Sequence, residues 1–411
     1  MTSDALRGLR SEFPVLDGGL CFLDWGASGL IPEASREAVK TFVDKLAECP
    51  SALSVWPWGE HGDGPSGTRT AARGRIAAAL NAKADDVAIV ESTTQGLQMA
   101  AEAIRTTEGD NIVLFDLDYL AVALPWTMSA RARKLELRFA PHREGALHVD
   151  DVLARIDEKT KVVALSTICW TTGALIDLEA IGAECAARGI LLVVDAVQTF
   201  GVVPLDPARI SASFVACGGH KWLCSPLGAG FLYVSPRAAA RARPGRFGFL
   251  SGRPSTHKDW PSWFRAGDCG ADETPVFPTG GMSFETGGHP SWAGAIGLDR
   301  SLTLLGRTAP GEILAHVRML GTRLIEGLDR LGLATWTPRD PALRAGTIVV
   351  RAPHGREQEL AWCDELRKQR IVATARYAKG VGGVRVCFHG MNLAADVDRL
   401  LEALARLVRG G

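Results

Sequence analysis

Short apolar runs alternate with amphipathic stretches between about residue 75 and about residue 235. The runs are rich in Val, Ile and Leu on both faces, which is typical of parallel strands covered on both sides. Five runs predict strands: DDVAIVES, NIVLFDL, KVVALST, GILLVVDA and GAGFLYV. Between two of them, DLEAIGAECAARG places Leu178, Ile181 and Cys185 on one helical face and ends at Gly189. This alternation predicts a doubly wound α/β domain around a mainly parallel sheet.

The pattern changes after this region. Residues 244–281 are rich in Gly, Pro and aromatic residues and show little periodicity, so we expect a long functional or interfacial loop. Two helical stretches, the strand pattern AGTIVVRAP and the closing helix AADVDRLLEALARLV then predict a separate α+β domain. We therefore divide the chain into an N-terminal segment (1–20), a large α/β domain (21–290) and a small C-terminal domain (291–411).

Composition narrows the classes of ligand. The 411 residues carry 46 Lys and Arg against 46 Asp and Glu, a formal net charge of zero, which favours neither nucleic acid nor an acidic membrane as a partner. No apolar run is long enough to span a membrane, and the N-terminus lacks an apolar signal segment, so we expect a cytoplasmic protein. The nine cysteines form no Cys-x-x-Cys pair, which predicts reduced, mostly buried thiols and no metal site.

Candidate chemistry lies where predicted strands end. Asp195 follows the run GILLVV, and ligands of open α/β sheets bind at the carboxyl ends of strands. Lys221 lies further along the chain, in the segment GGHKW. Ser92, Thr93 and Thr94 begin a predicted helix after another predicted strand. An enzyme that uses pyridoxal phosphate needs these three parts: a lysine for a Schiff base, a carboxylate for the pyridine nitrogen and a helix N-terminus for the phosphate. Taken singly, they could be a surface lysine, an ion-paired carboxylate and an ordinary helix cap.

Eight motifs in order carry a resemblance to a known family. They are FLDWGASGLIP, ESTTQGL, DLDYLAVALPW, LSTICWTTGALIDLEAI, VVDAVQTFG, GGHKWLCSPLGAGFLYV, FETGGHP and VRVCFHGMN. Together they resemble the class V aminotransferase family of pyridoxal-phosphate enzymes, which includes cysteine desulfurases, isopenicillin N epimerase-like enzymes and C–S lyases. The resemblance implies the fold type I architecture of these enzymes, with a mainly parallel seven-stranded sheet and a smaller C-terminal domain. It also implies pyridoxal 5'-phosphate as cofactor, an amino acid as substrate and a homodimer.

The resemblance assigns roles residue by residue. Lys221 matches the Schiff-base lysine that also moves the Cα proton, and Asp195 matches the partner of the pyridine nitrogen. The remaining matches are Gln198 to the residue near the phenolate oxygen, Thr93, Thr94 and His220 to phosphate contacts, Tyr119 to the aromatic residue stacked on the ring, and Arg385 to the arginine that binds the substrate carboxylate. Tyr119 could instead be a core aromatic residue, and Arg385 a domain-interface ion pair.

Several positions depart from the family pattern. Gly218 stands where relatives carry a serine, which removes one phosphate contact. Trp25 and Trp170 stand where relatives carry asparagines, and either shape the substrate site or fill the core beside it. His289 could reach a partner subunit's phosphate in place of an arginine lost at Ser283.

The segment before Arg385 bears on the reaction. A cysteine desulfurase needs a thiolate on a mobile loop there, but RIVATARYAKGVGGVR contains no cysteine. Cys387 falls in an apparent strand, where we expect it to be packed. Arg376 and Tyr377 occupy the predicted loop, where Arg376 could bind a second anionic group of the substrate or remain solvated.

The resemblance favours an enzyme that removes the Cα proton of an amino acid bound through an external aldimine and eliminates a thiol, a C–S β-lyase, because the lyase-rich branches of the family look closest. An isopenicillin N epimerase-like epimerase or an aminotransferase would use the same residues. A non-catalytic protein that binds the cofactor or a partner is the alternative from another class.

Overall fold

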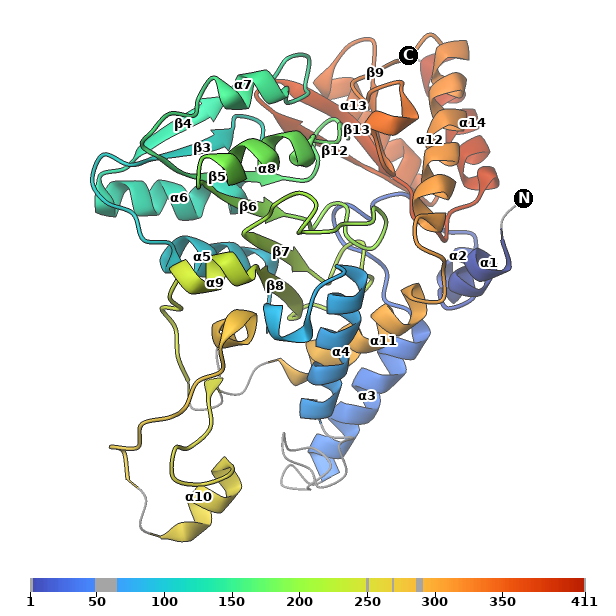
Figure 1. Cartoon of the computed structure of the whole chain (residues 1–411). Helices are drawn as coiled ribbons and strands as arrows, with labels where there is room; N and C mark the ends of the chain where they lie inside the picture. The colour runs from blue at the N-terminus through green and yellow to red at the C-terminus, as the bar shows by residue number, and fades with distance from the viewer. Residues whose placement is uncertain (1–2, 49–64, 249–250, 268–269, 286–290, 410–411) are drawn as a thin grey trace.

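The computed structural model describes residues 3–48, 65–248, 251–267, 270–285 and 291–409. Its centre is a seven-stranded sheet (Figure 1). In spatial order the strands are β2 (Val87–Val90), β8 (Gly230–Val234), β7 (Phe214–Gly218), β6 (Leu191–Asp195), β5 (Thr160–Ser166), β3 (Asn111–Phe115) and β4 (Glu136–Ala140). Only β8 runs against its neighbours in this sheet. All five predicted strands are present, and the predicted fold class is confirmed.

Helices cover both faces of this sheet because its strands are apolar on both sides. One apolar cluster joins the sheet to α5 (Thr93–Ala103), α6 (Leu120–Arg133) and α9 (Pro236–Arg241). A second cluster on the other face includes α4 (Pro65–Ala79), α7 (Val149–Leu153) and α8 (Leu178–Ala187). The predicted helix face of α8 is confirmed, since Leu178, Ile181 and Cys185 are all buried.

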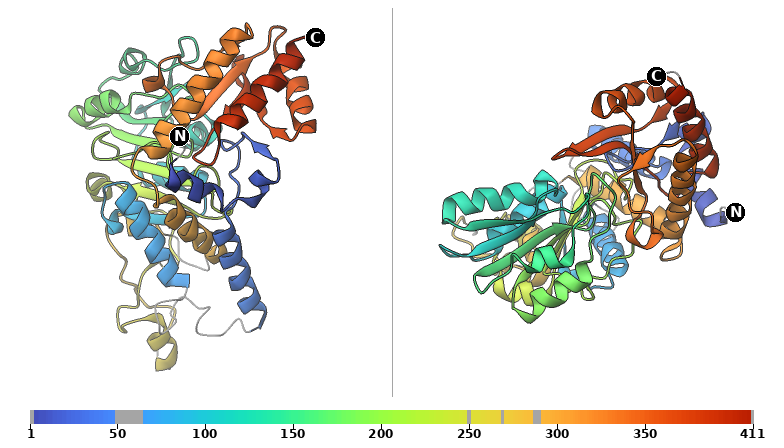
Figure 2. Two further views of the ribbon diagram at one scale, coloured as in Figure 1. Left: turned by 90° about the vertical axis from the view of Figure 1, so that its right-hand side faces the viewer. Right: turned by 90° about the horizontal axis from the view of Figure 1, so that it is seen from above.

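The C-terminal elements form a second lobe beside the sheet (Figure 2). Its antiparallel sheet has the order β12 (Thr374–Ala378), β13 (Val381–Cys387), β10 (Thr347–Arg351) and β9 (Ala334–Thr335). Its helices are α12 (Glu312–Arg330), α13 (Arg356–Lys368) and α14 (Ala394–Arg409). The predicted closing helix matches α14, which buries Val397, Leu400 and Leu404.

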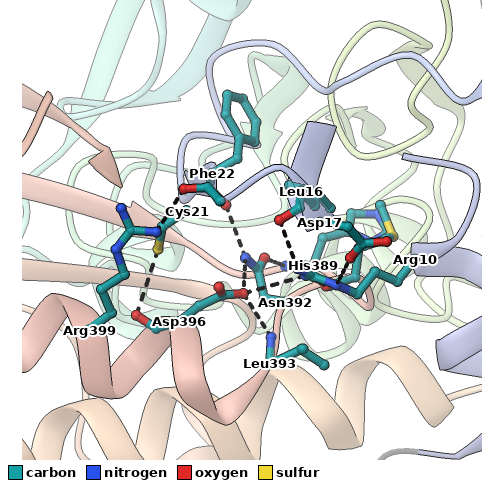
Figure 3. A network of polar contacts seen from close by, with 12 residues as sticks. Arg10, Leu16, Asp17, Cys21, Phe22, His389, Asn392, Leu393, Asp396 and Arg399 are labelled. Carbon is teal, nitrogen blue, oxygen red and sulfur yellow. Dashed lines mark hydrogen bonds and ion pairs between the residues drawn. The ribbon is translucent and has the colours of Figure 1, made fainter. Parts of the chain in front are cut away.

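The start of the chain is built into this second lobe. After α1 (Asp4–Arg10) and α2 (Pro14–Asp17), strand β1 (Cys21–Phe22) pairs in parallel with β11 (Ile371–Val372). Asn392 donates to the carbonyl oxygen of Phe22 over 3.0 Å, and Arg10 donates to that of Met391 over 2.7 Å (Figure 3). The N-terminal segment thus completes the small lobe.

At the other predicted boundary, α11 (Trp292–Leu305) packs against α3 (Glu33–Glu48) and α4 of the large lobe. The hydroxyl groups of Ser35 and Ser301 lie 2.9 Å apart in this contact. The division at residues 20 and 290 stays a prediction, but the packing joins β1 to the small lobe and α11 to the large one.

The Gly- and Pro-rich segment is an arm that projects from the large lobe and carries α10 (Trp260–Ala266) (Figure 1). We did not expect a helix here, because its seven residues are too few to show a period. Asp259 caps its first turn by accepting from the N–H of Ser262 over 2.8 Å. The side chains of Trp260, Trp263 and Phe264 contact one another.

Among the described residues, no helix combines the length and apolar character needed to cross a bilayer.

Candidate active site

The amino end of α5 is one wall of the site. Ser92 caps this helix, and its hydroxyl accepts from the N–H of Gln95 over 3.1 Å. Thr93 is buried in the first turn, while Thr94 beside it is exposed. Free N–H groups and hydroxyls at a helix N-terminus attract anions. The predicted threonine pair therefore lies where a phosphate group would be stabilised.

Gly218 belongs to the same wall, at a position where a side chain would be crowded. Its N–H donates to Thr93 Oγ1 over 2.7 Å. A Cβ atom at position 218 would lie 3.0 Å from both Thr93 Oγ1 and His220 Nδ1. In place of the serine hydroxyl of its relatives, this chain has a close approach of Gly218, Thr93 and His220.

Asp195 and Lys221 lie together beyond this wall. Asp195 ends β6 and is buried, and one carboxylate oxygen accepts from the N–H of Val197 over 2.9 Å. Burial raises the pKa of Asp195 to about 6, opposed by that N–H and by the charge of Lys221. Burial likewise lowers the pKa of Lys221, against the attraction of Asp195. A lowered pKa favours the neutral amine, which is the form that attacks an aldehyde.

The loop of FLDWGASG covers the backbone at the lysine. The N–H of Gly29 donates to the carbonyl oxygen of His220 over 2.8 Å. A Cβ atom at Gly29 would lie 2.2 Å from the carbonyl oxygen of Lys221, so only glycine permits this approach. Burial, and then the charge of Lys221, lowers the pKa of His220.

Two predicted aromatic residues meet beside Lys221. The Nζ atom of Lys221 lies 5.6 Å from the ring centre of Tyr119. The Tyr119 ring meets that of Trp170 edge to face, with centroids 5.3 Å apart. Trp170 Nε1 donates to the carbonyl oxygen of Leu117 over 3.0 Å. Tyr119 is 45% exposed, so it is no core residue.

Gln198 lies one turn beyond Asp195, with both ends of its amide in use. It donates to the carbonyl oxygen of Gly26 over 3.0 Å and accepts from Trp222 Nε1 over 3.0 Å. The amide carries a second N–H, and its predicted role near a cofactor oxygen stays a prediction.

Arg385 enters from the small lobe. It lies in β13, its side chain is buried, and one of its terminal nitrogens is 3.4 Å from Asp24 Oδ1. Asp24 also accepts from the hydroxyl of Thr374 over 3.0 Å. The Nε atom of Arg385 has no hydrogen-bond partner among the described residues. Arg385 therefore forms the ion pair that was the alternative to substrate binding. Its Nε–H group is still a buried donor for a substrate carboxylate.

We expected a loop before Arg385, and this expectation is wrong, because the segment forms the hairpin of β12 and β13. Thr374 is the cross-strand partner of Arg385, and side chains alternate along a strand, so Arg376 shares their face. Arg376 is half-buried and donates to the carbonyl oxygen of Ala375 over 2.9 Å. Tyr377 points to the other face, where its hydroxyl donates to Glu359 of α13. At the hairpin tip, Lys379 Nζ lies 3.1 Å from Asp116 Oδ2 of the large lobe.

The predicted role of Trp25 in shaping the substrate site is also wrong. Trp25 is 0% exposed, and its Nε1 donates to Asn392 Oδ1 over 2.9 Å. The rings of Phe13, Phe22 and His389 surround it, so it offers no surface to a substrate and fills the core instead.

Three buried or half-buried carboxylates with structural partners were missed from the sequence. They are Asp24, Asp118 and Glu285. Glu285 accepts from Arg69 over 2.9 Å, from Arg73 over 2.6 Å and from the N–H of Ile89 over 2.8 Å. The available signal was an acid in each of the segments FLDWG, DLDY and FETGG, since a buried acid usually has a partner. His289 lies outside the described residues.

The fold and these groups define an enzyme that holds a cofactor aldehyde on a lysine between a buried carboxylate and a helix N-terminus. A sequence model of the family described as aminotransferase class-V matches residues 66–400. The chain belongs to this family, which confirms the predicted enzyme class and its pyridoxal-phosphate cofactor.

The similarity to known proteins extends over almost the whole chain. A probable cysteine desulfurase of Halalkalibacterium halodurans is 27% identical over 439 aligned residues, covering 97% of both chains. The isopenicillin N epimerase of Streptomyces clavuligerus is 26% identical over 414 residues, covering 96% of both. Among solved structures, the apo cysteine desulfurase of Thermococcus onnurineus NA1 matches with a TM-score of 0.83 at 24% identity, covering 98% of both chains. The complex of the cystine C–S lyase C-DES with cysteine persulfide matches with a TM-score of 0.82 at 23% identity, covering 96% of this chain and 99% of that one. At these identities the structural matches establish the fold.

Proposed function

We propose that this protein is a C–S β-lyase acting on a cysteine-derived amino acid. The observation that carries the proposal is the position of its thiols. All seven described cysteines are buried, and burial raises the pKa of Cys387, the one nearest Arg385 in sequence. A persulfide-forming desulfurase needs an accessible thiolate near the substrate sulfur, whereas β-elimination needs none. Cys49 and Cys269 lie outside the described residues.

The residues divide the work as follows. Bound pyridoxal phosphate supplies an electron sink for the electron pair left at the substrate Cα. Lys221 removes the Cα proton, and the depressed pKa of its amine suits a base at neutral pH. Asp195 stabilises a proton on the pyridine nitrogen, and Arg385 orients the substrate carboxylate. Thr93, Thr94 and His220 hold the phosphate.

The overall reaction is balanced without an oxidant. The Cα–H and Cβ–S bonds break, the thiol leaves with a proton, and water converts the remaining enamine to pyruvate and ammonium. A cysteine S-conjugate and water thus give a thiol, pyruvate and ammonium.

Arg376 suggests the substrate class. It lies on the face of the hairpin that carries Arg385 and Thr374. We place there a second anionic group of the substrate, as in a disulfide or thioether with two carboxylates. An Arg376→Gln variant should raise KM for such a substrate about tenfold, and that for a neutral S-alkyl cysteine less than twofold.

The second candidate is epimerisation, favoured by the full-length similarity to isopenicillin N epimerase. It uses the same proton removal at Cα but returns the proton to the other face. An aminotransferase would return it to the cofactor carbon and need a keto acid.

The test separates these reactions. The purified protein with pyridoxal phosphate is mixed with L-cystine, L-cystathionine or S-methyl-L-cysteine, and pyruvate and thiol are assayed, with Lys221→Ala as control. Pyruvate formed only by the unmodified protein supports the lyase. Solvent deuterium entering Cα with loss of chirality but no pyruvate replaces it with the epimerase. Keto-acid-dependent amine transfer replaces it with the aminotransferase.

We also propose a homodimer with the arm in its interface. Phe264 is 60% exposed and Phe277 is 38% exposed on the arm, and exposed aromatic residues are enriched at interfaces. Light scattering of the unmodified protein should give twice the chain mass. Phe264→Glu should lower it toward the monomer mass, and an unchanged mass would remove the arm from the interface.

A further inference from the structure

Asp118 is a partly buried carboxylate to which the reaction described above gives no role. It lies three residues beyond the end of β3, directly before Tyr119. Its Oδ2 accepts from the backbone N–H of Ser166 over 2.8 Å. Its Oδ1 accepts from the backbone N–H of Tyr119 over 2.8 Å and from the hydroxyl of Ser166. One side chain therefore joins the ends of two neighbouring strands.

Both ends of this bridge lead to the active site. Ser166 ends β5 and is the cross-strand partner of Asp195 in β6. Tyr119 is the N-cap residue of α6, and its own side chain forms no capping hydrogen bond. The direction of the Tyr119 ring thus depends on how the turn from Leu117 to Tyr119 is held. Asp118 holds its backbone, and Trp170 contacts both the ring of Tyr119 and the carbonyl oxygen of Leu117.

We propose that Asp118 is a positioning residue that acts through Tyr119, fixing its ring beside Lys221 where it covers the cofactor. This rests on the proposed function, because only a cofactor on Lys221 gives the ring something to cover. Burial raises the pKa of Asp118 to about 7, opposed by the hydrogen bonds from Ser166 and Tyr119. These hydrogen bonds offset only part of the cost of burying the charged carboxylate.

Asparagine is a sharp probe of this bridge. The two backbone N–H groups donate to different oxygens of Asp118, and asparagine has only one oxygen. In either orientation its NH₂ group faces a backbone N–H, so one side of the bridge is lost. Asp118→Asn should therefore raise the dissociation constant of pyridoxal phosphate about tenfold. Asp110→Asn is the matched control, because Asp110 is a buried carboxylate before the other end of the same strand.

A double-mutant cycle tests the route through Tyr119. In a Tyr119→Ala background, Asp118→Asn should change cofactor affinity less than twofold. An equal loss of affinity in both backgrounds, or no loss in the single variant, overturns the proposal. Far-ultraviolet circular dichroism confirms that each variant is folded.

Hydrogen exchange provides a second measurement that needs no cofactor. In Asp118→Ala the Tyr119 amide has lost its acceptor, so its exchange should accelerate at least tenfold in the apoprotein, while Asp110→Asn leaves it unchanged. Unchanged exchange in Asp118→Ala overturns the proposal even if the unmodified protein binds cofactor. Failure of the unmodified protein to bind cofactor would instead overturn the proposed function.

Discussion

A side chain at position 218 should weaken cofactor binding, and the family serine should recover only what its hydroxyl adds. The family pattern alone predicts a gain, since a hydroxyl near the phosphate adds one charge-assisted hydrogen bond of about 1.5 to 3 kcal/mol. The geometry predicts a cost, because a Cβ atom would lie 3.0 Å from both Thr93 Oγ1 and His220 Nδ1. Thr93 Oγ1 is itself held by the N–H of Gly218 over 2.7 Å, so it cannot retreat without losing that bond.

Two variants separate the two contributions. Gly218→Ala adds only the Cβ atom, and overpacking of a tight contact costs about 1 to 3 kcal/mol, so its cofactor dissociation constant should rise about 5- to 150-fold. Gly218→Ser adds the same atom and the hydroxyl, whose gain of about 1.5 to 3 kcal/mol is of the same size as that cost, so it should bind more tightly than Gly218→Ala and within about tenfold of the unmodified protein.

The assay is a titration of the apoprotein with pyridoxal phosphate, followed by the absorbance of the lysine-bound cofactor. Thermal unfolding of the apoproteins reports whether the same contact destabilises the fold. A Gly218→Ala protein that binds the cofactor as tightly as the unmodified protein would refute the steric reasoning and show that Thr93 and His220 move apart.

Three further predictions concern charge. Glu285→Ala should lower the free energy of unfolding by about 3 to 5 kcal/mol, because the buried Arg69 and Arg73 of α4 lose the carboxylate with which both form ion pairs. Urea denaturation measures this loss, and a value below about 1 kcal/mol would contradict the prediction. The pKa of Asp195 is about 6 in the folded protein, against an ordinary value of 3.8. Between these pH values the folded apoprotein keeps a proton that the unfolded chain releases, so its stability falls as pH rises from about 4 to about 6. Urea melts across that range should show Asp195→Asn gaining about 1 to 3 kcal/mol relative to the unmodified apoprotein, and equal pH slopes would contradict the assignment. Lys379→Met should raise KM for the amino acid no more than about fivefold, and only at low salt, because the ion pair with Asp116 is half exposed.

The fold was largely accessible from the sequence because its strands are apolar on both faces and evenly spaced. Two strands were missed. Strand β7 is buried throughout, but its sequence FVACG ends in small residues and makes a weak apolar run. Strand β4 lies at the edge of the sheet, where the residues from Glu136 to Phe139 are exposed or half-buried, so no apolar run marks it. The β12–β13 hairpin was expected to be a loop because Gly380 lies in its turn and Gly382 and Gly383 lie at the start of its second strand.

For the site, motifs located Lys221, Asp195, Thr93 and Tyr119 in one region, since each follows a strand whose carboxyl end is fixed by the sheet. Motifs could not decide the direction of a side chain. Trp25 lies one residue from Asp24, yet it points into the core while Asp24 points to Arg385. That choice depends on Asn392, which is far away in sequence and was not paired with Trp25 by any local pattern.

The pairing of β1 with β11 sets the order in which this chain can be completed. Cys21 leaves the ribosome long before its partner Ile371, by roughly 20 to 70 s at ordinary rates of synthesis. Throughout that interval Leu9 and Trp25, both fully buried in the finished protein, have no small lobe to enter. The large lobe can close first, but the N-terminal segment must wait for the end of the chain. A nascent chain that stalls before residue 371 would therefore expose a leading apolar segment to chaperones and proteases, and a strand made late would decide whether the first-made one survives.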